Sequence, residues 1–371
     1  MPANSRRRPP AHECIVVGAG LLGLATARAL SQRGVEVVVL ETASPGHPAS
    51  GSQGRTRIFR LGYPDPLYAD MAARSLLLWR DLEDEIGQTL LSTTGQLTFG
   101  PEVDAIAKAM EEVGHPATEL SETARQERFP DFAIDGPALF EPDSGVLDAP
   151  AALHALAETA DIDLRTGTPV RLLEDEGDRV AVTMADGTEL AATVAVNCAG
   201  PHAVGLMTRT RIPSARPPTF QQVAYVAAEQ PLPIFIEWGE DMIYGLPVPG
   251  EPLYKLAQHR PGPLLDPDHG PLEDDADLVT VLTDAAARIF PSLDPTPVAT
   301  ECCVYDNTVD GDFILDRLGQ VVLGCGTSGH GFKFGPLFGE LLADLVTGAE
   351  SSVDLARFAA TRSFLQVLRN P

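Results

Sequence analysis

A glycine-rich turn near the start of the chain constrains the fold more than any other feature of the sequence. The run GAGLLG at residues 18–23 follows a β-rich segment and precedes a segment of helix formers. In such a turn Gly18 permits the tight bend, Gly20 lets the backbone approach a pyrophosphate, and Gly23 lets the helix pack closely on the strand. The free N–H groups and the positive dipole end of the helix favour a phosphate. We therefore expect a strand, turn and helix that bind a dinucleotide.

The next segment completes this pattern. Residues 35–40 hold four valines and are typical of a parallel strand that is buried on both faces, and the strand ends at Glu41, 18 residues past Gly23. A carboxylate at this place accepts hydrogen bonds from the adenosine ribose hydroxyls and disfavours a ribose that carries a 2′-phosphate. The pattern does not by itself separate NAD from FAD.

Beyond this unit the chain does not continue as repeated βαβ units, so we expect a second, inserted domain. Residues 88–140 mix a strand-like segment with a helix, and residues 212–300 are proline-rich and strand-like. We assign both to a substrate-binding domain, and residues 11–87, 141–211 and 301–371 to the nucleotide-binding domain. The predicted fold class is α/β plus α+β, a Rossmann-like dinucleotide-binding domain interleaved with an antiparallel-sheet substrate domain.

Two further small-residue turns favour FAD over NAD. A predicted strand that ends at Asn197 runs into Gly200, and residues 324–335 hold five glycines before a predicted helix. Such turns again aim backbone donors at an anionic or electron-rich group. A single large cofactor that is touched by three distant segments fits FAD better than NAD. In the last turn the residues expected at the cofactor are Gly326, Gly329, His330, Gly331 and Phe332.

Composition excludes several other classes of function. Acidic residues outnumber basic ones by 52 to 27, and a net charge of −25 repels nucleic acid and anionic lipid. No apolar run reaches the length of about 20 residues that a membrane span needs. The five cysteines are odd in number and scattered, which favours a reducing compartment, the cytoplasm, over a disulfide scaffold. There is no CxxC pair and no tight Cys/His group, so we expect no metal site.

The motifs resemble the family of monomeric sarcosine oxidase and N-methyltryptophan oxidase, within the wider glycine and D-amino acid oxidase group of flavoproteins. The likeness spans nearly the whole chain and includes QGRTRIFR at 53–60, YGLP at 244–247, YKL at 254–256, CVY at 303–305 and SGHGFKF at 328–334. The resemblance implies FAD as the cofactor, a small amine or amino acid as the substrate, oxygen as the electron acceptor, and a monomer.

The resemblance also implies roles for single residues. Cys303 stands where family members attach a cysteine sulfur to the 8α-methyl carbon of the flavin, although the neighbouring Cys302 leaves the register open by one residue. Arg60 and Lys333 match a pair of cations that hold the substrate carboxylate, as suits a planar guanidinium and a point-charge ammonium. Lys255 corresponds to a lysine near flavin N5 that helps oxygen accept electrons.

Three further residues match the family pattern. Arg57 corresponds to a basic residue beside the flavin ring, and Tyr244 and His259 correspond to residues that line the substrate pocket. Three departures weaken the assignment of sarcosine itself as the substrate. Gln53 stands where sarcosine oxidases carry a pocket histidine, Arg55 replaces an acid in the same loop, and the loop at 248–251 contains proline rather than being glycine-rich.

The expected reaction is oxidation of a C–N bond in a secondary amino acid, an N-methyl or N-alkyl amino acid. A hydride equivalent passes to FAD, the imine hydrolyses, and oxygen reoxidises the flavin to give hydrogen peroxide. A rival hypothesis keeps the flavin and changes the substrate to a cyclic imino acid, a fructosyl amino acid or an intermediate of specialised metabolism. A second rival is a flavin dehydrogenase that passes electrons to a protein or quinone. A non-catalytic nucleotide-binding module and a nicotinamide dehydrogenase complete the set of candidates.

Overall fold

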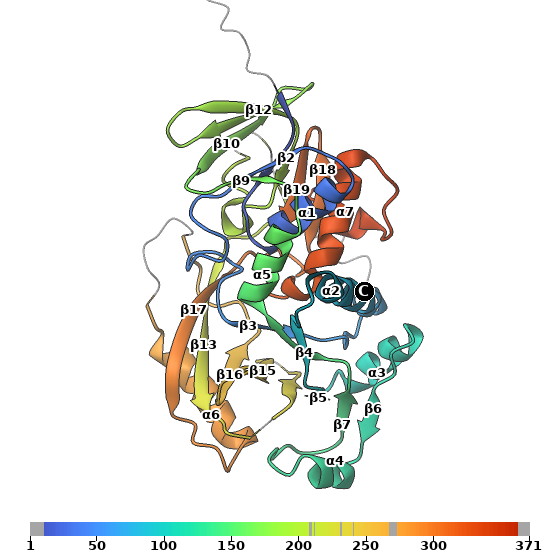
Figure 1. Ribbon diagram of the computed structural model, residues 1–371. Helices are drawn as coiled ribbons and strands as arrows, with labels where there is room; N and C mark the ends of the chain where they lie inside the picture. The colour runs from blue at the N-terminus through green and yellow to red at the C-terminus, as the bar shows by residue number, and fades with distance from the viewer. Residues whose placement is uncertain are drawn as a thin grey trace, which may run out of the picture.

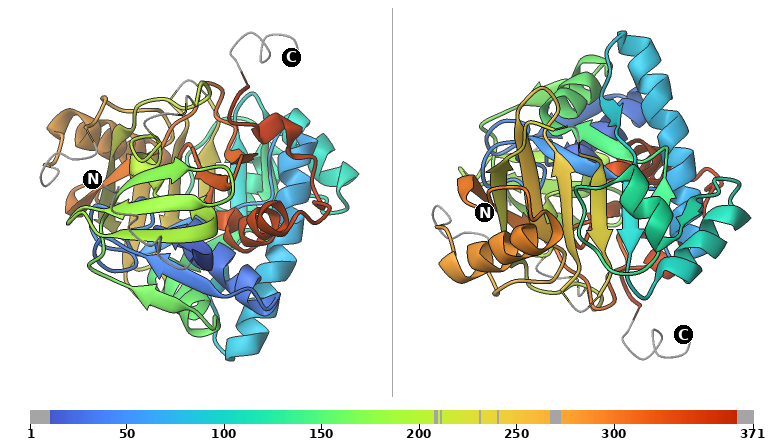
Figure 2. Two further views of the ribbon diagram at one scale, coloured as in Figure 1. Left: turned by 90° about the horizontal axis from the view of Figure 1, so that it is seen from above. Right: turned by 90° about the horizontal axis from the view of Figure 1, so that it is seen from below.

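The strands of the described residues form three sheets, which Figures 1 and 2 show from three directions. The computed structural model describes residues 11–207, 210, 212–230, 232–239, 241–266 and 273–362. The ends of the predicted domain segments at 208–209, 211 and 363–371 lie outside the described residues, as do 231, 240 and 267–272. In Figure 1 residues 11–40, 163–197 and 314–347 lie together above residues 96–141 and 219–305.

The first sheet is Rossmann-like, as the sequence predicts. Its strand order is β10-β11-β12-β1-β2-β9, and β12 also pairs with β19, which pairs with β18. The parallel strands are β1 (Ala11–Val17), β2 (Val37–Leu40), β9 (Asp163–Arg165), β12 (Glu189–Asn197) and β19 (Val321–Cys325). The antiparallel strands are β10 (Val170–Asp175), β11 (Val180–Met184) and β18 (Ile314–Leu318).

The parallel strands are buried on both faces. Val16 and Val39 pack into one apolar cluster, with helices α1 (Leu21–Gln32), α5 (Ala149–Glu158) and α7 (Gly335–Thr347), while Val17 and Val38 pack into another cluster on the opposite face. Successive side chains of a strand point to opposite faces, so an unbroken run of valines is what a double-sided core requires.

The second sheet carries the middle of the chain, in the order β17-β13-β16-β15-β14-β5-β7-β6. Its strands are β5 (Gln96–Phe99), β6 (Thr118–Leu120), β7 (Ala138–Glu141), β13 (Thr219–Ala227), β14 (Ile234–Glu237), β15 (Ile243–Pro247), β16 (Leu253–Gln258) and β17 (Pro297–Tyr305). The pairs are antiparallel as predicted, with one exception, because β14 and β5 run parallel.

Helix α6 (Ala276–Ile289) covers one face of this sheet, in a region whose sequence pattern predicts only strands. The side chain of Asp275 caps the helix by accepting from the N–H groups of Asp277 and Leu278. Phe290 follows the helix and lies against Phe235 of the sheet, with ring centroids 5.5 Å apart. Helices α3 (Val103–Glu112) and α4 (Glu122–Arg128) belong to the 88–140 segment.

A third, small sheet joins the two parts. It contains β3 (Thr56–Phe59), β8 (Gly145–Asp148) and β4 (Leu91–Thr93), and the long helix α2 (Pro66–Ile86) follows β3. The predicted domain boundary between 300 and 301 falls inside β17, which pairs with β13 as far as Tyr305. Residues 301–305 therefore belong to the second sheet. In the part of the chain that the structure describes, no helix is long and apolar enough to cross a membrane.

We expect Gly23→Ala to destabilise the fold, because a Cβ at this position would lie 1.8 Å from the carbonyl oxygen of Gly18. The strand–turn–helix unit must open to admit the methyl group, and such overpacking lowers the free energy of unfolding by about 1–3 kcal/mol. The loss exceeds the gain in helix propensity of about 1 kcal/mol. The exposed Gly239, around which no atom lies within 4 Å of an added Cβ, provides the matched control Gly239→Ala. Equal thermal unfolding midpoints for the two variants would contradict the packing argument.

Candidate active site

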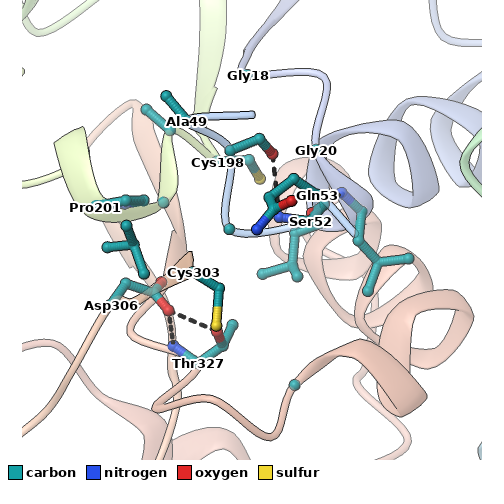
Figure 3. A pocket seen from close by; sticks show the side chains of 18 of the residues that line it. Gly18, Gly20, Ala49, Ser52, Gln53, Cys198, Pro201, Cys303, Asp306 and Thr327 are labelled. Carbon is teal, nitrogen blue, oxygen red and sulfur yellow. Dashed lines mark hydrogen bonds between the residues drawn. The ribbon is translucent and has the colours of Figure 1, made fainter. Parts of the chain in front are cut away.

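A cavity of about 700 Å³ runs between the first and second sheets. Figure 3 shows Gly20 and Ser52 on one side of this cavity, and Cys303 and Asp306 on the opposite side. Segments that lie far apart in the sequence meet here. Most of the residues predicted for a site line this cavity: Gly18, Gly20, Glu41, Arg57, Gly200, Tyr244, Lys255, Cys303, Gly329, His330, Gly331, Phe332 and Lys333.

Four predicted site residues do not line the cavity. Gly23 packs against the backbone of Gly18, which is the structural part of its expected role. Gly326 has a φ of +66° and donates its N–H to Asp306, so it shapes the turn behind the cavity wall. Arg60 and His259 are not among the lining residues, but both lie near Lys333: in addition to burial, the charges of Arg60 and Lys333 lower the pKa of His259, and the charge of Arg60 lowers the pKa of Lys333.

The first end of the cavity fits a dinucleotide. A Cβ at Gly18 would lie 2.5 Å from the carbonyl oxygen of Cys198, which explains why the turn needs glycine. The Glu41 carboxylate, only 6% exposed, accepts from Ala19 N at 2.7 Å and from Ala43 N at 3.0 Å. Glu41 thus holds the turn and also lines the cavity. The N-terminus of α1 lines the same end of the cavity, where its free N–H groups favour a phosphate.

The third glycine turn is held by an aspartate that sequence reasoning missed. Asp306 accepts hydrogen bonds from Gly326 N at 2.7 Å, Thr327 N at 3.0 Å and Thr327 Oγ1 at 2.6 Å. A Cβ at Gly329 would lie 2.2 Å from the ring of Tyr305, so this side chain packs directly on the glycine. The signal for Asp306 was its place immediately after the CVY motif. Burial raises the pKa of the Asp306 carboxyl, and the three donors oppose that shift.

Strand β17 decides which of the two adjacent cysteines faces the cavity. Neighbouring side chains on a strand point to opposite faces. Cys303 lines the cavity, whereas the sulfur of Cys302 lies 3.6 Å from Asp274 Oδ1 and 3.7 Å from Gln222 Oε1. Burial raises the pKa of the Cys303 thiol, and the nearby cations Lys255 and Arg57 lower it. The strand register therefore favours Cys303 as the cysteine at the cofactor.

Two cations lie at the middle of the cavity. Lys255 on β16 is only 6% exposed, and its Nζ donates to the carbonyl of Thr56 at 3.4 Å. Burial lowers the pKa of Lys255 to about 8, with a contribution from the charge of Arg57. The Arg57 guanidinium lies 5.3 Å from the centroid of the Phe332 ring, which keeps it at the cavity wall.

A second pair of cations surrounds Tyr63. The guanidinium of Arg60 lies 4.2 Å from the centroid of the Tyr63 ring, and its Nη1 is buried without a hydrogen-bond partner among the described residues. The Nζ of Lys333 donates to Tyr63 Oη at 2.9 Å and to His330 O at 2.7 Å. Burial and the charge of Arg60 hold the pKa of Lys333 well below its usual range. Buried donors of this kind are costly to leave unpaired, so the pair favours an anionic ligand.

Both histidines beside these cations are neutral. His330 Nε2 lies 3.0 Å from the carbonyl oxygen of Gly311, which can only accept, so His330 Nδ1 accepts from Tyr63 Oη at 3.3 Å. Desolvation and the charge of Lys333 hold the pKa of His330 well below its usual value. Desolvation, Arg60 and Lys333 lower the pKa of His259 to about 3. Among the described residues no group of His, Cys, Asp and Glu is placed to hold a metal ion.

Comparison with known proteins agrees with this geometry. Residues 13–345 match the protein family described as FAD dependent oxidoreductase. The chain is 29% identical to monomeric sarcosine oxidase of Bacillus sp. (strain NS-129), with 95% of this chain and 97% of the relative covered. It is 28% identical to N-methyl-L-tryptophan oxidase of Yersinia pestis (strain Pestoides F), with 95% and 99% covered.

A solved structure shows the same fold. The chain is similar to NikD, described as an unusual amino acid oxidase essential for nikkomycin biosynthesis, with a TM-score of 0.83 and 26% sequence identity. The likeness covers 94% of this chain and 97% of NikD, so both domains and the connection between them are included.

We expect Asp306→Asn to loosen the third glycine turn. The amide has one acceptor oxygen in place of two, so the N–H groups of Gly326 and Thr327 compete for it, and the free energy of unfolding falls by about 1–2 kcal/mol. Thermal unfolding of the FAD-loaded protein measures the change. Asp135→Asn, at an exposed loop position, is the control and should leave the midpoint in place. A midpoint for Asp306→Asn equal to that of the control would show that the carboxylate does not hold the turn.

Proposed function

Because this chain belongs to the family of FAD-dependent oxidoreductases, we propose that it oxidises the C–N bond of a secondary amino acid, an N-methyl or N-alkyl amino acid. Oxygen is the electron acceptor in this proposal, and the products are hydrogen peroxide and an imine that hydrolyses. The observation that carries the proposal is the buried pair Arg60 and Lys333 around Tyr63, beside the cavity that fits the cofactor. The activities named for two relatives, on sarcosine and on N-methyl-L-tryptophan, support it.

The pair supplies what an amino acid carboxylate needs. A guanidinium binds the two oxygens of a carboxylate in one plane, and an ammonium adds a point charge. The Nη1 of Arg60 has no partner among the described protein atoms, and a substrate carboxylate satisfies it. The carboxylate charge also favours the protonated form of Lys333, whose pKa burial depresses. When the substrate carboxylate binds, it therefore also compensates the positive charges of Arg60 and Lys333.

The same cations keep the amine nitrogen reactive. Two positive charges nearby disfavour a third, so the substrate amine binds neutral, with its lone pair free. His259 and His330 are neutral by the same effect and leave the nitrogen uncharged. FAD, when bound, accepts a hydride equivalent from the carbon next to that nitrogen. No strong base is needed for this transfer. The groups near the substrate site, Arg60, Lys333 and the two histidines of low pKa, include no strong base.

The cofactor would be held from both ends of the cavity. Gly20 and the N-terminus of α1 receive the pyrophosphate, and Glu41 receives the ribose. Arg57 and Lys255 lie toward the ring end, where a fixed positive charge stabilises the anion formed as oxygen is reduced. We propose that the sulfur of Cys303, which lines the cavity, is joined as a thioether to the 8α-methyl carbon of the flavin. In that linkage a C–S bond would replace one S–H and one C–H bond, and the two electrons released would pass through the flavin to oxygen. All five cysteines are free, which supports a cytoplasmic protein; we propose that it is a monomer.

We expect a panel of amines to identify the reaction. An N-methyl or N-alkyl amino acid should bleach the yellow colour under nitrogen and release peroxide in air. Lys333→Met should raise KM for that substrate by about 100-fold, which corresponds to about 3 kcal/mol for a charge-assisted contact, whereas Lys108→Met on an exposed helix face should not. Bleaching without peroxide would identify a dehydrogenase. The absence of bleaching by every amine would refute the proposal.

Acid precipitation tests the covalent linkage. In the wild-type protein the yellow colour should stay in the pellet, because a thioether survives denaturation. Cys303→Ser should release the colour into the supernatant, and Cys302→Ser, whose sulfur faces Asp274 on the other side of β17, should not. Release of the colour from the wild-type protein would refute the covalent linkage but would still agree with non-covalent binding of FAD.

A further inference from the structure

Glu301 lies on the cavity face of the second sheet, two residues before Cys303 on β17. In that sheet β13 is paired on one side with β16 and on the other with β17, so that Tyr225 is opposite Lys255 and Val223 is opposite Glu301. Since residues two apart on a strand share a face, Tyr225 lies between Lys255 and Glu301 on the side that faces the cofactor. The sequence motifs assign no role to Glu301 or Tyr225.

Two groups hold the Glu301 carboxylate in place. Tyr225 Oη donates to Glu301 Oε2 at 2.7 Å, and Arg55 Nε lies 3.6 Å from Glu301 Oε1. Arg55 makes its shorter contact, 2.7 Å, with the more exposed Glu251. Arg55 therefore compensates the charge of Glu301 only in part, and Glu301 also lines the cavity.

Lys255 has a crowded electrostatic environment. Its Nζ lies 5.9 Å from the centroid of the Tyr225 ring, the hydroxyl of which is hydrogen-bonded to Glu301. Burial and Arg57 favour the neutral amine, and Cys303 and then Glu301 oppose them by raising the pKa of Lys255. The titratable and charged side chains that face this region are Arg57 from β3, Tyr225 from β13, Tyr244 from β15, and Glu301, Cys303 and Tyr305 from β17; the more exposed Arg55 contacts Glu301.

The position of Glu301 relative to Arg57 strengthens this link. A Cβ built on Gly54 would lie 3.2 Å from Arg57 Nη1 and 3.3 Å from Glu301 Oε2, so the two charged atoms flank the same glycine. Glu301 thus lies between the arginines of the 53–60 loop and the lysine of β16. A carboxylate in that place compensates cations that would otherwise repel one another at the cavity wall.

We propose that Glu301, fixed by Tyr225 and Arg55, is the counter-ion that keeps Lys255 protonated beside the cofactor. Glu301 acts through Lys255 and is a positioning residue. Its consequence for oxygen reduction rests on the proposed function, in which the Lys255 ammonium stabilises negative charge on oxygen. The Tyr225 hydroxyl donates to the carboxylate, which makes its ring more electron-rich toward Lys255 and strengthens the cation–π attraction.

The small number of lysines allows a direct test. The chain has only Lys108, Lys255 and Lys333, so FAD-loaded protein that carries ¹³C at the lysine ε-carbon gives three NMR signals, and Lys108→Arg and Lys255→Met assign two of them. The chemical shift of each ε-carbon, followed with pH, reports the protonation of that amine. This readout needs neither substrate nor turnover.

We expect the midpoint for Lys255 to fall by about one pH unit in Glu301→Gln, a tenfold change in its proton affinity, because a negative charge near the ammonium is lost. Tyr225→Phe keeps the ring but frees the carboxylate, so its midpoint should fall by less. Glu158→Gln, at the exposed C-terminal end of α5 beside the first sheet, is the matched control and should not change the midpoint for Lys255. An unchanged midpoint in both Glu301→Gln and Tyr225→Phe would overturn the inference.

The pH profile of flavin reoxidation then separates this inference from the proposed function. In Glu301→Gln the decline in reoxidation rate should move to lower pH together with the NMR midpoint, while anaerobic reduction by substrate stays at the wild-type rate. A shifted NMR midpoint with an unshifted reoxidation profile would support the counter-ion and refute the role of Lys255 in oxygen reduction.

Discussion

The gathering of four cations at or beside one cavity, three of them buried and Arg57 half-buried, is the constraint on which the rest of the structure depends. Arg57, Arg60, Lys255 and Lys333 converge there in a protein whose net charge is −25. Taking a charge out of water is expensive unless a partner compensates it. The two ends meet this demand differently, because Lys255 has Glu301 across Tyr225 while Arg60 and Lys333 have only neutral partners among the described side chains.

The fold brings these cations together through short, stiff connections. Strand β3 and the residues after it carry Arg57 and Arg60, β16 carries Lys255, and the third glycine turn carries Lys333 just before α7. The carboxylate of Asp306, directly after β17, holds that turn by hydrogen bonds. Strand β17 therefore fixes the positions of both Cys303, the proposed flavin-linking cysteine, and the turn that carries Lys333. Each side chain is thereby aimed by backbone hydrogen bonds, which is how a site obtains precise geometry on a rigid scaffold.

How far the sequence predicts this structure depends on how local each signal is. The first turn and its strands were predicted correctly, since the glycine spacing and the valine run are local consequences of close packing. Helix α6 and the extent of β17 were missed. The apolar face of α6 packs on Phe235 and its neighbours, which lie on strands distant in the sequence, and β17 is an edge strand whose mostly half-buried residues show no alternation of buried and exposed positions. Arg60 and His259 match the family motifs but do not line the cavity; Arg60 lies against the ring of Tyr63, and His259 lies 3.5 Å from Tyr305 Oη, contacts between distant segments that the motifs do not encode.

The two buried lysines place opposite demands on the folded protein and on the reaction. Because their pKa values are lower in the folded state than in the unfolded chain, folding favours the neutral amines, and for Lys255 the stability lost at low pH returns as pH rises from about 8 toward the unfolded value. In the proposed reaction, substrate binding and oxygen reduction favour the ammonium instead. On that proposal the conflict at Lys333 is resolved only while a substrate carboxylate is bound, so the charge of Lys333 follows substrate occupancy. Lys255 would act after the substrate has reacted, and the proposed permanent counter-ion, Glu301, would keep it charged at that stage.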